Sequence, residues 1–574
     1  MKHVYRYTQQ WHLLIILAIG LKGISTGIDL MIPYLMGVLI DTGIVDRNLK
    51  ISMQLCGIMF ILAVVGCILT VISHYCSSKG AQKIGESLRN NTYQHIQSMA
   101  IKDVEQISTG SLIMRVTHDI DQIQQTVIVM ARMMVRAPLI LVGGTVAALT
   151  IDVYLTGILF IGMGIVFFIS ILMFRIVKPI YRQAQRQMDG LAEKLRERIN
   201  GVRTIKAFNK QGDEVARIDL ENKKIYDLEI KAGKLNASMG PSITIVSNVS
   251  IIVVLLIGGM RVQGGSLEIG QIVIIIQYIN MIMMAVTMLP RIFMMMSRTS
   301  ASIGRLEEIF DIKEEALIGE IEESLVDEPI LAFQDVCFGY PGMTGATLKH
   351  ISFEIKKGEI VGIIGGTGSG KTTLIQLLLQ LYQPTNGKIM YRGLPLTAYK
   401  RELLKKKITA AIQNYHIFSM SIKDNVMLDK DFDREKLSEA VRVAQLEDVL
   451  SALVEEEGYL VSQNGMNLSG GQKQRLSIAR TLYREAEVIV LDDVSSALDY
   501  QTDVKLRQAI CNHYKEQTLI IASQRLSSVR YADKIIVMDK GKVVGVGTHD
   551  TLCKTCAVYQ TINKVQGESR REAI

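Results

Sequence analysis

Six apolar stretches precede residue 300, and they restrict the first half of this chain to one kind of structure. They cover residues 11–40, 51–78, 137–151, 153–174, 235–260 and 269–290. Most exceed the roughly 20 residues that a helix needs to cross about 30 Å of hydrocarbon, where the backbone must hydrogen-bond to itself. The third stretch is short, but residues from Met130 onward can extend it. The sequence therefore predicts six membrane-spanning helices.

Basic residues give these helices an orientation. The segments 79–136 and 178–234 are long and rich in Lys and Arg, whereas 41–50, 262–268 and the single residue Asp152 form short connections with little positive charge. Because Lys and Arg concentrate on the cytoplasmic side, we expect the long segments and both termini to lie there. The long segments have helical spacing, so we expect the membrane helices to continue into the cytoplasm.

Two features within the spans are candidates for contact with a transported molecule. Lys22 and Asp29 lie seven residues apart and share one helix face. Asp29 either contacts substrate, lines an aqueous cavity or lies near the outer interface. The last span is rich in methionine around Pro290, which suits either a cavity for irregular apolar ligands or ordinary helix packing.

A glycine-rich segment at 365–372 predicts a phosphate-binding loop of the form G-x-x-x-x-G-K-[ST], flanked by two apolar runs. A strand before the loop and a helix after it turn backbone N–H groups toward phosphate. We expect Lys371 to reach the β- and γ-phosphates and the Thr372 hydroxyl to bind Mg²⁺. The predicted nucleotide-binding residues of this segment are Gly365, Gly366, Thr367, Gly368, Ser369, Gly370, Lys371, Thr372 and Thr373.

A second motif, Leu-Ser-Gly-Gly-Gln at 468–472, narrows the class of ATP-binding protein. With both motifs, the chain resembles an ABC exporter half-transporter over nearly its whole length. This resemblance implies an all-α six-helix transmembrane domain of the ABC exporter fold, fused to an α/β P-loop nucleotide-binding domain. We place the transmembrane domain at 1–311, a linker at 312–328 and the nucleotide-binding domain at 329–574.

The resemblance also assigns roles outside the phosphate loop. Tyr340 matches the aromatic residue that stacks on adenine, and Gln413 matches the Q-loop glutamine, which touches Mg²⁺. Asp492 ends an apolar strand and matches the aspartate that coordinates Mg²⁺. Asp499 matches the D-loop. The signature residues that bind nucleotide held by the opposite subunit are Ser469, Gly470, Gly471 and Gln472.

Two positions depart from the family pattern. Asp493 stands where hydrolytic members carry a glutamate that polarises the attacking water, and Gln524 stands where they carry a histidine. One methylene fewer withdraws the carboxylate by roughly 1.5 Å, enough to cost about a hundredfold in rate where geometry must be near-ideal. A neutral amide cannot supply imidazolium charge. Asp493, Gln524 and Gln413 are therefore the candidate catalytic residues of a site that binds ATP but cleaves it poorly.

The chain is accordingly similar to the degenerate-site subunit of heterodimeric bacterial multidrug ABC exporters. This implies a multi-pass protein of the bacterial cytoplasmic membrane, with ATP and Mg²⁺ as cofactors. It would pair with a second ABC half-transporter in the lipid bilayer and export hydrophobic small molecules. The alternatives are a regulatory or structural membrane ATP-binding subunit and a slow homodimeric exporter. The net charge of +8 is modest for 574 residues, and we expect no nucleic-acid partner.

Overall fold

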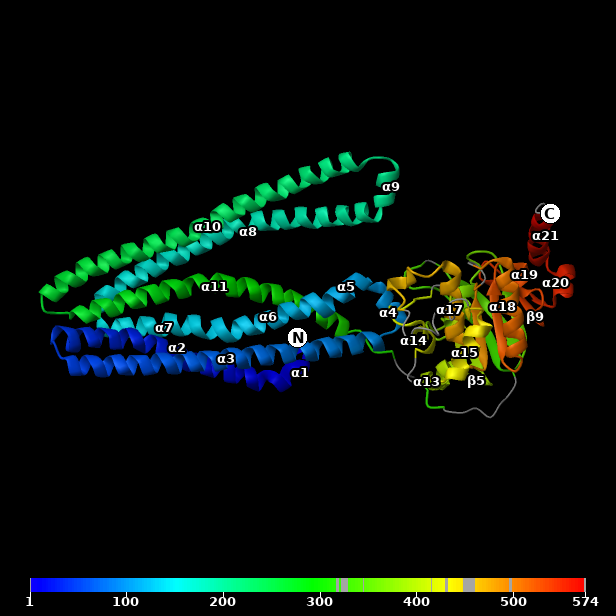
Figure 1. Cartoon of the computed structure of the whole chain (residues 1–574), viewed down its shortest axis with the longest axis horizontal. Helices are drawn as coiled ribbons and strands as arrows, with labels where there is room; N and C mark the ends of the chain where they lie inside the picture. Colours follow the sequence, from blue (N-terminus) through cyan, green and yellow to red (C-terminus); the bar gives the residue numbers. More distant parts are fainter. Residues whose placement is uncertain are drawn as a thin grey trace. The chain divides into compact units, whose positions relative to one another are not determined.

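The protein divides into two compact units in the computed structural model (Figure 1). Residues 2–315, 319–321, 329–343, 345–413, 415–428, 432–447, 460–494 and 498–571 are described. The first unit comprises Met1–Ser98 and Ile107–Lys313, and the second comprises Met99–Gln106 and Glu314–Ile574. The short segment Met99–Gln106 therefore belongs to the second unit although it interrupts the sequence of the first.

The first unit is built from helices. They are α1 (Lys2–Thr8), α2 (His12–Val38), α3 (Leu49–Ser98), α5 (Thr109–Met114), α6 (Ile120–Val129), α7 (Val135–Ile151), α8 (Val153–Asn200), α9 (Val202–Ala207), α10 (Gln211–Gln263) and α11 (Ile269–Phe310). Short π-helical turns at Leu39–Val45, Arg115–Asp119 and Met130–Met134 extend α2 and join α5, α6 and α7.

The prediction of six membrane-spanning helices is confirmed among the described residues. Helices long and apolar enough to cross a bilayer run over His3–Val45, Leu49–Ser98, Thr109–Ile151, Val153–Asn200, Gln211–Gln263 and Ile269–Phe310. The upstream extension of the third span is part of this set. At 1.5 Å per residue, a helix of 50 residues is about 75 Å long, more than twice the hydrocarbon thickness. Each long helix therefore continues beyond the bilayer.

Packing within this unit depends on small residues at close approaches. A Cβ added at Gly270 of α11 would lie 2.2 Å from the carbonyl oxygen of Gly37 in α2, so only glycine permits this contact. Helices α8 and α10 run side by side (Figure 1), and Gly162 of α8 faces the hydroxyl of Ser250 in α10. Large apolar side chains such as Phe168 remain exposed on the outer faces, as expected for helices that contact lipid.

The second unit is an α/β domain. Its strands are β1 (Leu331–Phe338), β2 (Leu348–Ile355), β3 (Ile360–Ile364), β4 (Asn386–Tyr391), β5 (Leu394–Pro395), β6 (Ile408–Ala411), β7 (Val488–Asp492), β8 (Thr518–Ser523), β9 (Lys534–Asp539) and β10 (Lys542–Gly547). Its helices are α4 (Ile101–Gln106), α12 (Lys371–Leu378), α13 (Arg401–Lys407), α14 (Ile422–Met427), α15 (Arg434–Val443), α17 (Gly470–Leu482), α18 (Tyr500–His513), α19 (Leu526–Val529), α20 (His549–Thr555) and α21 (Ala557–Arg571).

Two sheets organise the described strands of this domain. One is antiparallel with the order β2-β1-β4-β5, and the other has the order β10-β9-β3-β8-β7-β6, parallel from β9 to β6. Strand β7 is buried at every residue: Val488 and Val490 face one hydrophobic core, and Ile489 and Leu491 face the other. Burial on both faces is typical of parallel strands covered by helices and explains why this segment has a continuous apolar sequence.

Candidate ATP site and its membrane partner unit

The phosphate loop connects β3 to α12, as the sequence predicts. Gly368 and Gly370 have φ values of 76° and 102°, in the left-handed region that favours glycine. Gly370 is also the residue before the first turn of α12, so the loop turns its backbone directly into the helix N-terminus. A Cβ added at Gly365 would lie 2.3 Å from the carbonyl oxygen of Met538 in β9. The loop therefore requires glycine at these three positions for its shape.

Lys371 lies inside this loop. Its side chain is buried, and its Nζ donates to the carbonyl oxygens of Gly365 at 2.8 Å and Gly366 at 3.0 Å. Burial lowers the pKa of Lys371, and the nearby Asp492 and Asp493 carboxylates oppose that shift. A buried ammonium is costly without an anionic partner. The loop thus holds a cation where a phosphate group would bind.

Asp492 ends β7 beside Lys371 and Thr372. It is 1% exposed, and neither carboxylate oxygen has a hydrogen-bond partner among the described residues. Burial raises the pKa of Asp492, and the neighbouring Thr372 hydroxyl and Lys371 ammonium oppose the shift only in part. Carboxylate oxygens are ligands of the kind that Mg²⁺ prefers, and buried oxygens without a partner indicate a ligand that binds there. Asp492 and Thr372 therefore fit a magnesium ion, which would neutralise phosphate charge when bound.

Tyr340 and Thr373 meet at the edge of this loop. The Tyr340 hydroxyl donates to Oε1 of Gln376 at 2.6 Å and lies 3.1 Å from the Thr373 hydroxyl. The Tyr340 ring makes edge-to-face contacts with Phe338 and Tyr382 at centroid distances of 5.0 and 5.3 Å. These contacts hold the ring beside α12, in a position from which its face could stack on a base.

The two departures from the family pattern lie at the carboxyl ends of β7 and β8. Asp493 has a φ of 50°, and its backbone is held by Ala522 and by the side-chain amide of Gln474. Among the described residues its carboxylate has no hydrogen-bond partner. Gln524 is exposed, and its Oε1 accepts a bond of 3.2 Å from the Thr367 hydroxyl. Gln524 therefore reaches the phosphate loop, whereas Asp493 is positioned only by its backbone.

The remaining candidates lie apart from this group. Ser469 caps α17, where its side chain and that of Gln472 each accept from the other's backbone N–H. Asp499 caps α18 by accepting from the Thr502 N–H, which lowers the pKa of Asp499. Gln413 follows β6 and is exposed. No hydrogen bond among the described residues joins Ser469, Asp499 or Gln413 to the phosphate loop. Ser496 and Ala497 of the D-loop match lie outside the described residues.

Comparisons with known proteins agree with this architecture. Residues 15–286 match the family model for the ABC transporter transmembrane region, and residues 348–496 match a second family model described as ABC transporter. The ABC transporter ATP-binding protein YfiB of Bacillus subtilis is 30% identical over 99% of this chain and 98% of its own. The chain belongs to the ABC transporter family.

Two further proteins are similar to this ABC transporter over nearly its whole length. The ATP-dependent lipid A-core flippase of Wigglesworthia glossinidia brevipalpis is 27% identical over 94% of this chain and 93% of its own. The solved structure of a bacterial Atm1-family ABC exporter with ATP bound has a TM-score of 0.78 at 19% identity, covering 98% of this chain and 99% of that one. The protein is thus an ABC half-transporter with an exporter fold, and its ATPase domain is coupled to transport.

Sequence reasoning missed several residues that complete the site of this transporter. Gln376 positions Tyr340, Gln474 bonds to the backbone of Asp493, and Gln566 of α21 donates to the backbone oxygen of Gln524 at 2.8 Å. Glu105 of α4 accepts from the Tyr382 hydroxyl, and Ile101 packs against the same hydrophobic core. Spacing from a motif identifies none of them, because each acts through a contact distant in sequence.

Helix α4 lies within the basic segment 79–136 but belongs to the ATP-binding unit, together with the rest of Met99–Gln106. It contributes Ile101 and Glu105 to the packing of that domain.

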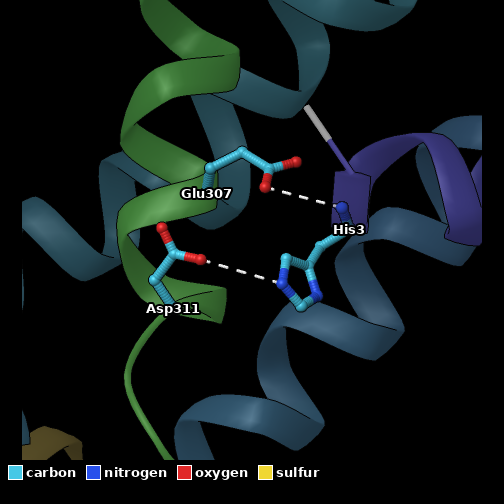
Figure 2. Close-up of side chains that lie close together, drawn as sticks. All are labelled: His3, Glu307 and Asp311. Carbon is cyan, nitrogen blue, oxygen red and sulfur yellow. Dashed lines mark hydrogen bonds and ion pairs between the residues drawn. The ribbon is translucent and has the colours of Figure 1, made fainter.

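Three side chains near the N-terminus have a spacing that could hold a metal ion (Figure 2). Figure 2 shows His3 of α1 facing Glu307 and Asp311 at the end of α11. The Glu307 carboxylate already accepts from the Val4 N–H at 2.9 Å, and the His3 ring lies 3.7 Å from Asp311. These bonds attach α1 to α11. They account for the cluster without a metal ion.

The intramembrane charges occupy an interface between helices. Lys22 is buried and donates to the Thr70 hydroxyl of α3 at 3.2 Å, while the Asp29 carboxylate lies 3.5 Å from the Arg136 guanidinium of α7. In the sixth span, Met283 packs in the helix core, whereas Pro290 and Met294 line a cavity. Asp29 is therefore neutralised within this chain, and the methionines divide between packing and cavity lining.

Proposed function

We propose that this half-transporter exports amphipathic small molecules, drugs or lipids, across the bacterial cytoplasmic membrane as one half of a heterodimer. Its phosphate loop would hold an ATP that is cleaved slowly. Its signature loop, Ser469, Gly470 and Gly471, would complete the hydrolytic ATP site of the partner subunit. The flippase relative, whose name assigns it lipid A-core, supports an amphipathic cargo.

One contrast within the ATP site carries this proposal. Lys371 and Asp492 are both buried. Within the described part of the chain, Lys371 donates only to groups of its own loop, so the residues that would hold nucleotide and Mg²⁺ are all present. Asp493 and Gln524, which would act on water and the γ-phosphate, both differ from the hydrolytic pattern. A shorter carboxylate on a left-handed backbone position starts farther from any bound water, and distance is costly in general base catalysis.

ATPase measurements on the purified full-length chain test the proposal. We expect the chain alone to turn over slowly and Asp493→Glu with Gln524→His to raise its rate by about a hundredfold. Asp433→Glu, the same chemical change at the half-buried cap of α15, is the control and should leave the rate unchanged. Brisk turnover by the unaltered chain alone would contradict the degenerate site and support a homodimeric exporter.

Pairing is tested with half-transporters of the same genome that carry Glu and His at the matching positions and an altered signature loop. In the correct pair, Ser469→Ala should abolish most ATPase activity, because Ser469 serves the partner's nucleotide. Asp493→Asn should change it little. The opposite ranking would contradict the asymmetric assignment. Rapid ATPase in the pair without substrate movement into inverted vesicles would favour a regulatory subunit.

A further inference from the structure

A cavity of about 750 Å³ lies inside the membrane unit, between α8, α10 and α11. Its walls include Met173 and Phe174 of α8, Met239 of α10, and Phe293 and Met294 of α11. Most of this lining is apolar and flexible, which suits hydrocarbon chains of varied shape. The cavity volume falls in the range of small-molecule sites in proteins.

The charged part of the lining is cationic. Lys178 and Arg182 of α8 and Arg298 of α11 all line the cavity, and no Asp or Glu is among its described lining residues. None of these three cations has an ion pair within the described part of the chain. Lys178 lies over the Phe174 ring, with its Nζ 5.3 Å from the ring centroid. By contrast, Arg198 farther along α8 is paired with Glu214 at 2.7 Å.

The apolar walls and the two arginines lie at different depths along the helices. From Val153, the start of α8, a rise of 1.5 Å per residue places Met173 at about 30 Å and Arg182 at about 43 Å. From Ile269, the start of α11, the same rise places Arg298 at about 43 Å. The same rise places Met294 of α11 at about 38 Å, so the apolar walls run from about 30 to 38 Å and the two arginines lie about 6 Å farther along. In a bilayer about 40–45 Å thick with its head groups, that position is at head-group depth. An amphiphile of the inner leaflet is arranged in the same way, with its chain in the hydrocarbon and its head group nearer the cytoplasmic surface.

We propose that this cavity binds an amphiphile with an anionic head group, such as an anionic glycerophospholipid. Its chain would lie against Phe174 and Met294, and its head group would lie among Lys178, Arg182 and Arg298. This deepens the proposed export function and rests on it for the identification of the ligand as cargo. Binding itself requires no ATP.

A tryptophan placed in the cavity wall measures this binding directly. Trp11 is the single tryptophan, so Trp11→Phe with Phe293→Trp gives one reporter at the cavity. The full-length protein is reconstituted without nucleotide in lipid containing brominated phosphatidylglycerol or brominated phosphatidylcholine, which quench tryptophan on contact. Each cation near an anionic lipid contributes roughly fivefold in affinity, so we expect at least about a fivefold preference for the anionic lipid.

Variants show whether the cavity cations cause that preference. Arg182→Gln with Arg298→Gln should reduce it to about twofold or less, and Arg182→Lys with Arg298→Lys should retain it. Lys79→Gln is the matched control: Lys79 of α3 lies at a similar depth beside the Tyr75 ring, outside the cavity, and its loss should change nothing.

Three results would overturn the proposal. They are equal quenching by both lipids, stronger quenching by a brominated cationic amphiphile, and a preference that Lys79→Gln lowers as much as the cavity variants. Displacement of the anionic lipid by millimolar inorganic phosphate would show that free phosphate, rather than an amphiphile, is the ligand. A preference that follows the cavity variants, with no export in the paired transporter, would leave this site intact and reject only the proposed function.

Discussion

An acidic residue lies at each end of strand β7, and the two carboxylates differ in their hydrogen-bond partners and in the direction of their pKa shifts. Glu487, just before the strand, accepts bonds of 2.7 Å from Tyr391 and Arg392 and a third bond from Lys407. Burial alone would raise the pKa of Glu487, but these bonds outweigh it and hold the pKa at about 2. Asp492, the last residue of the strand, has no such partner among the described residues, and burial raises its pKa.

The difference separates a residue that maintains the fold from one that is available to a ligand. A buried carboxylate with three donors stabilises the native state, because its charge is better solvated there than in the unfolded chain. A buried carboxylate without donors costs free energy until something binds it. We therefore propose that the end of β7 that carries Asp492 is the functional end and that the other end is structural.

Asp492→Asn tests the functional end and should have the largest effect. We expect the affinity for ATP in Mg²⁺ to fall at least about a hundredfold, because a metal ligand is lost. The free energy of unfolding without nucleotide should not fall by more than about 1 kcal/mol, because removing the buried charge relieves its desolvation cost. A fluorescent ATP analogue titrated against Mg²⁺, with thermal unfolding of the nucleotide-free chain, measures both.

Asp539→Asn is the matched control for that variant, because Asp539 ends β9, another strand of the same sheet. It should shift nucleotide affinity by less than about threefold, as expected for a half-buried charge at the end of a neighbouring strand. An Asp492→Asn protein that binds Mg²⁺ and ATP normally would remove the distinction between the two ends of β7.

The sequence predicts the functional end of β7 but not the structural end. Lys371 and Asp492 could be identified because the phosphate loop and the apolar strand are short local patterns with fixed spacing. The partners of Glu487 lie 80, 95 and 96 residues earlier in the chain, so only the folded sheet reveals them. The same limit applies to the membrane unit, where apolar length predicts the spans but not the pairing of Asp29 with Arg136.

Glu487→Gln tests the structural end. We expect the ATP-binding domain to lose about 2 kcal/mol of unfolding free energy at pH 7, while ATP affinity stays within about twofold. Hydrogen exchange of the β6 and β7 peptides in the full-length protein measures the stability of this domain. Glu485→Gln is the control, because its ion pair with Lys436 is 45% exposed on both sides and contributes little.

The difference in unfolding free energy between the parent and Glu487→Gln should depend on pH, which gives a second test. The folded pKa of Glu487 is depressed, so its stabilising effect is present above the unfolded pKa near 4.5 and is lost as pH falls toward about 2. The gap in stability between the parent and Glu487→Gln should therefore be constant from pH 8 to about pH 5.5 and narrow below about pH 4.5. A gap that widens on acidification would contradict the assigned pKa.

Tyr340 has in one side chain a hydroxyl that is bonded within the fold and a ring face that is available to a ligand. Substitutions of Tyr340 should change the measured free energies least among these variants. Its hydroxyl is already bonded to Gln376, whereas its ring face would be used only by a bound base. We expect Tyr340→Ala to weaken ATP binding about tenfold through lost stacking, and Tyr340→Phe to weaken it only about twofold. Inorganic triphosphate, which has no base, should bind both variants and the parent alike.

Tyr399→Phe removes a buried hydroxyl bond elsewhere in the domain and is the control. If Tyr340→Ala weakened triphosphate as much as ATP, the tyrosine would act by supporting α12 rather than by contacting adenine, and it would belong with Glu487 among the structural residues.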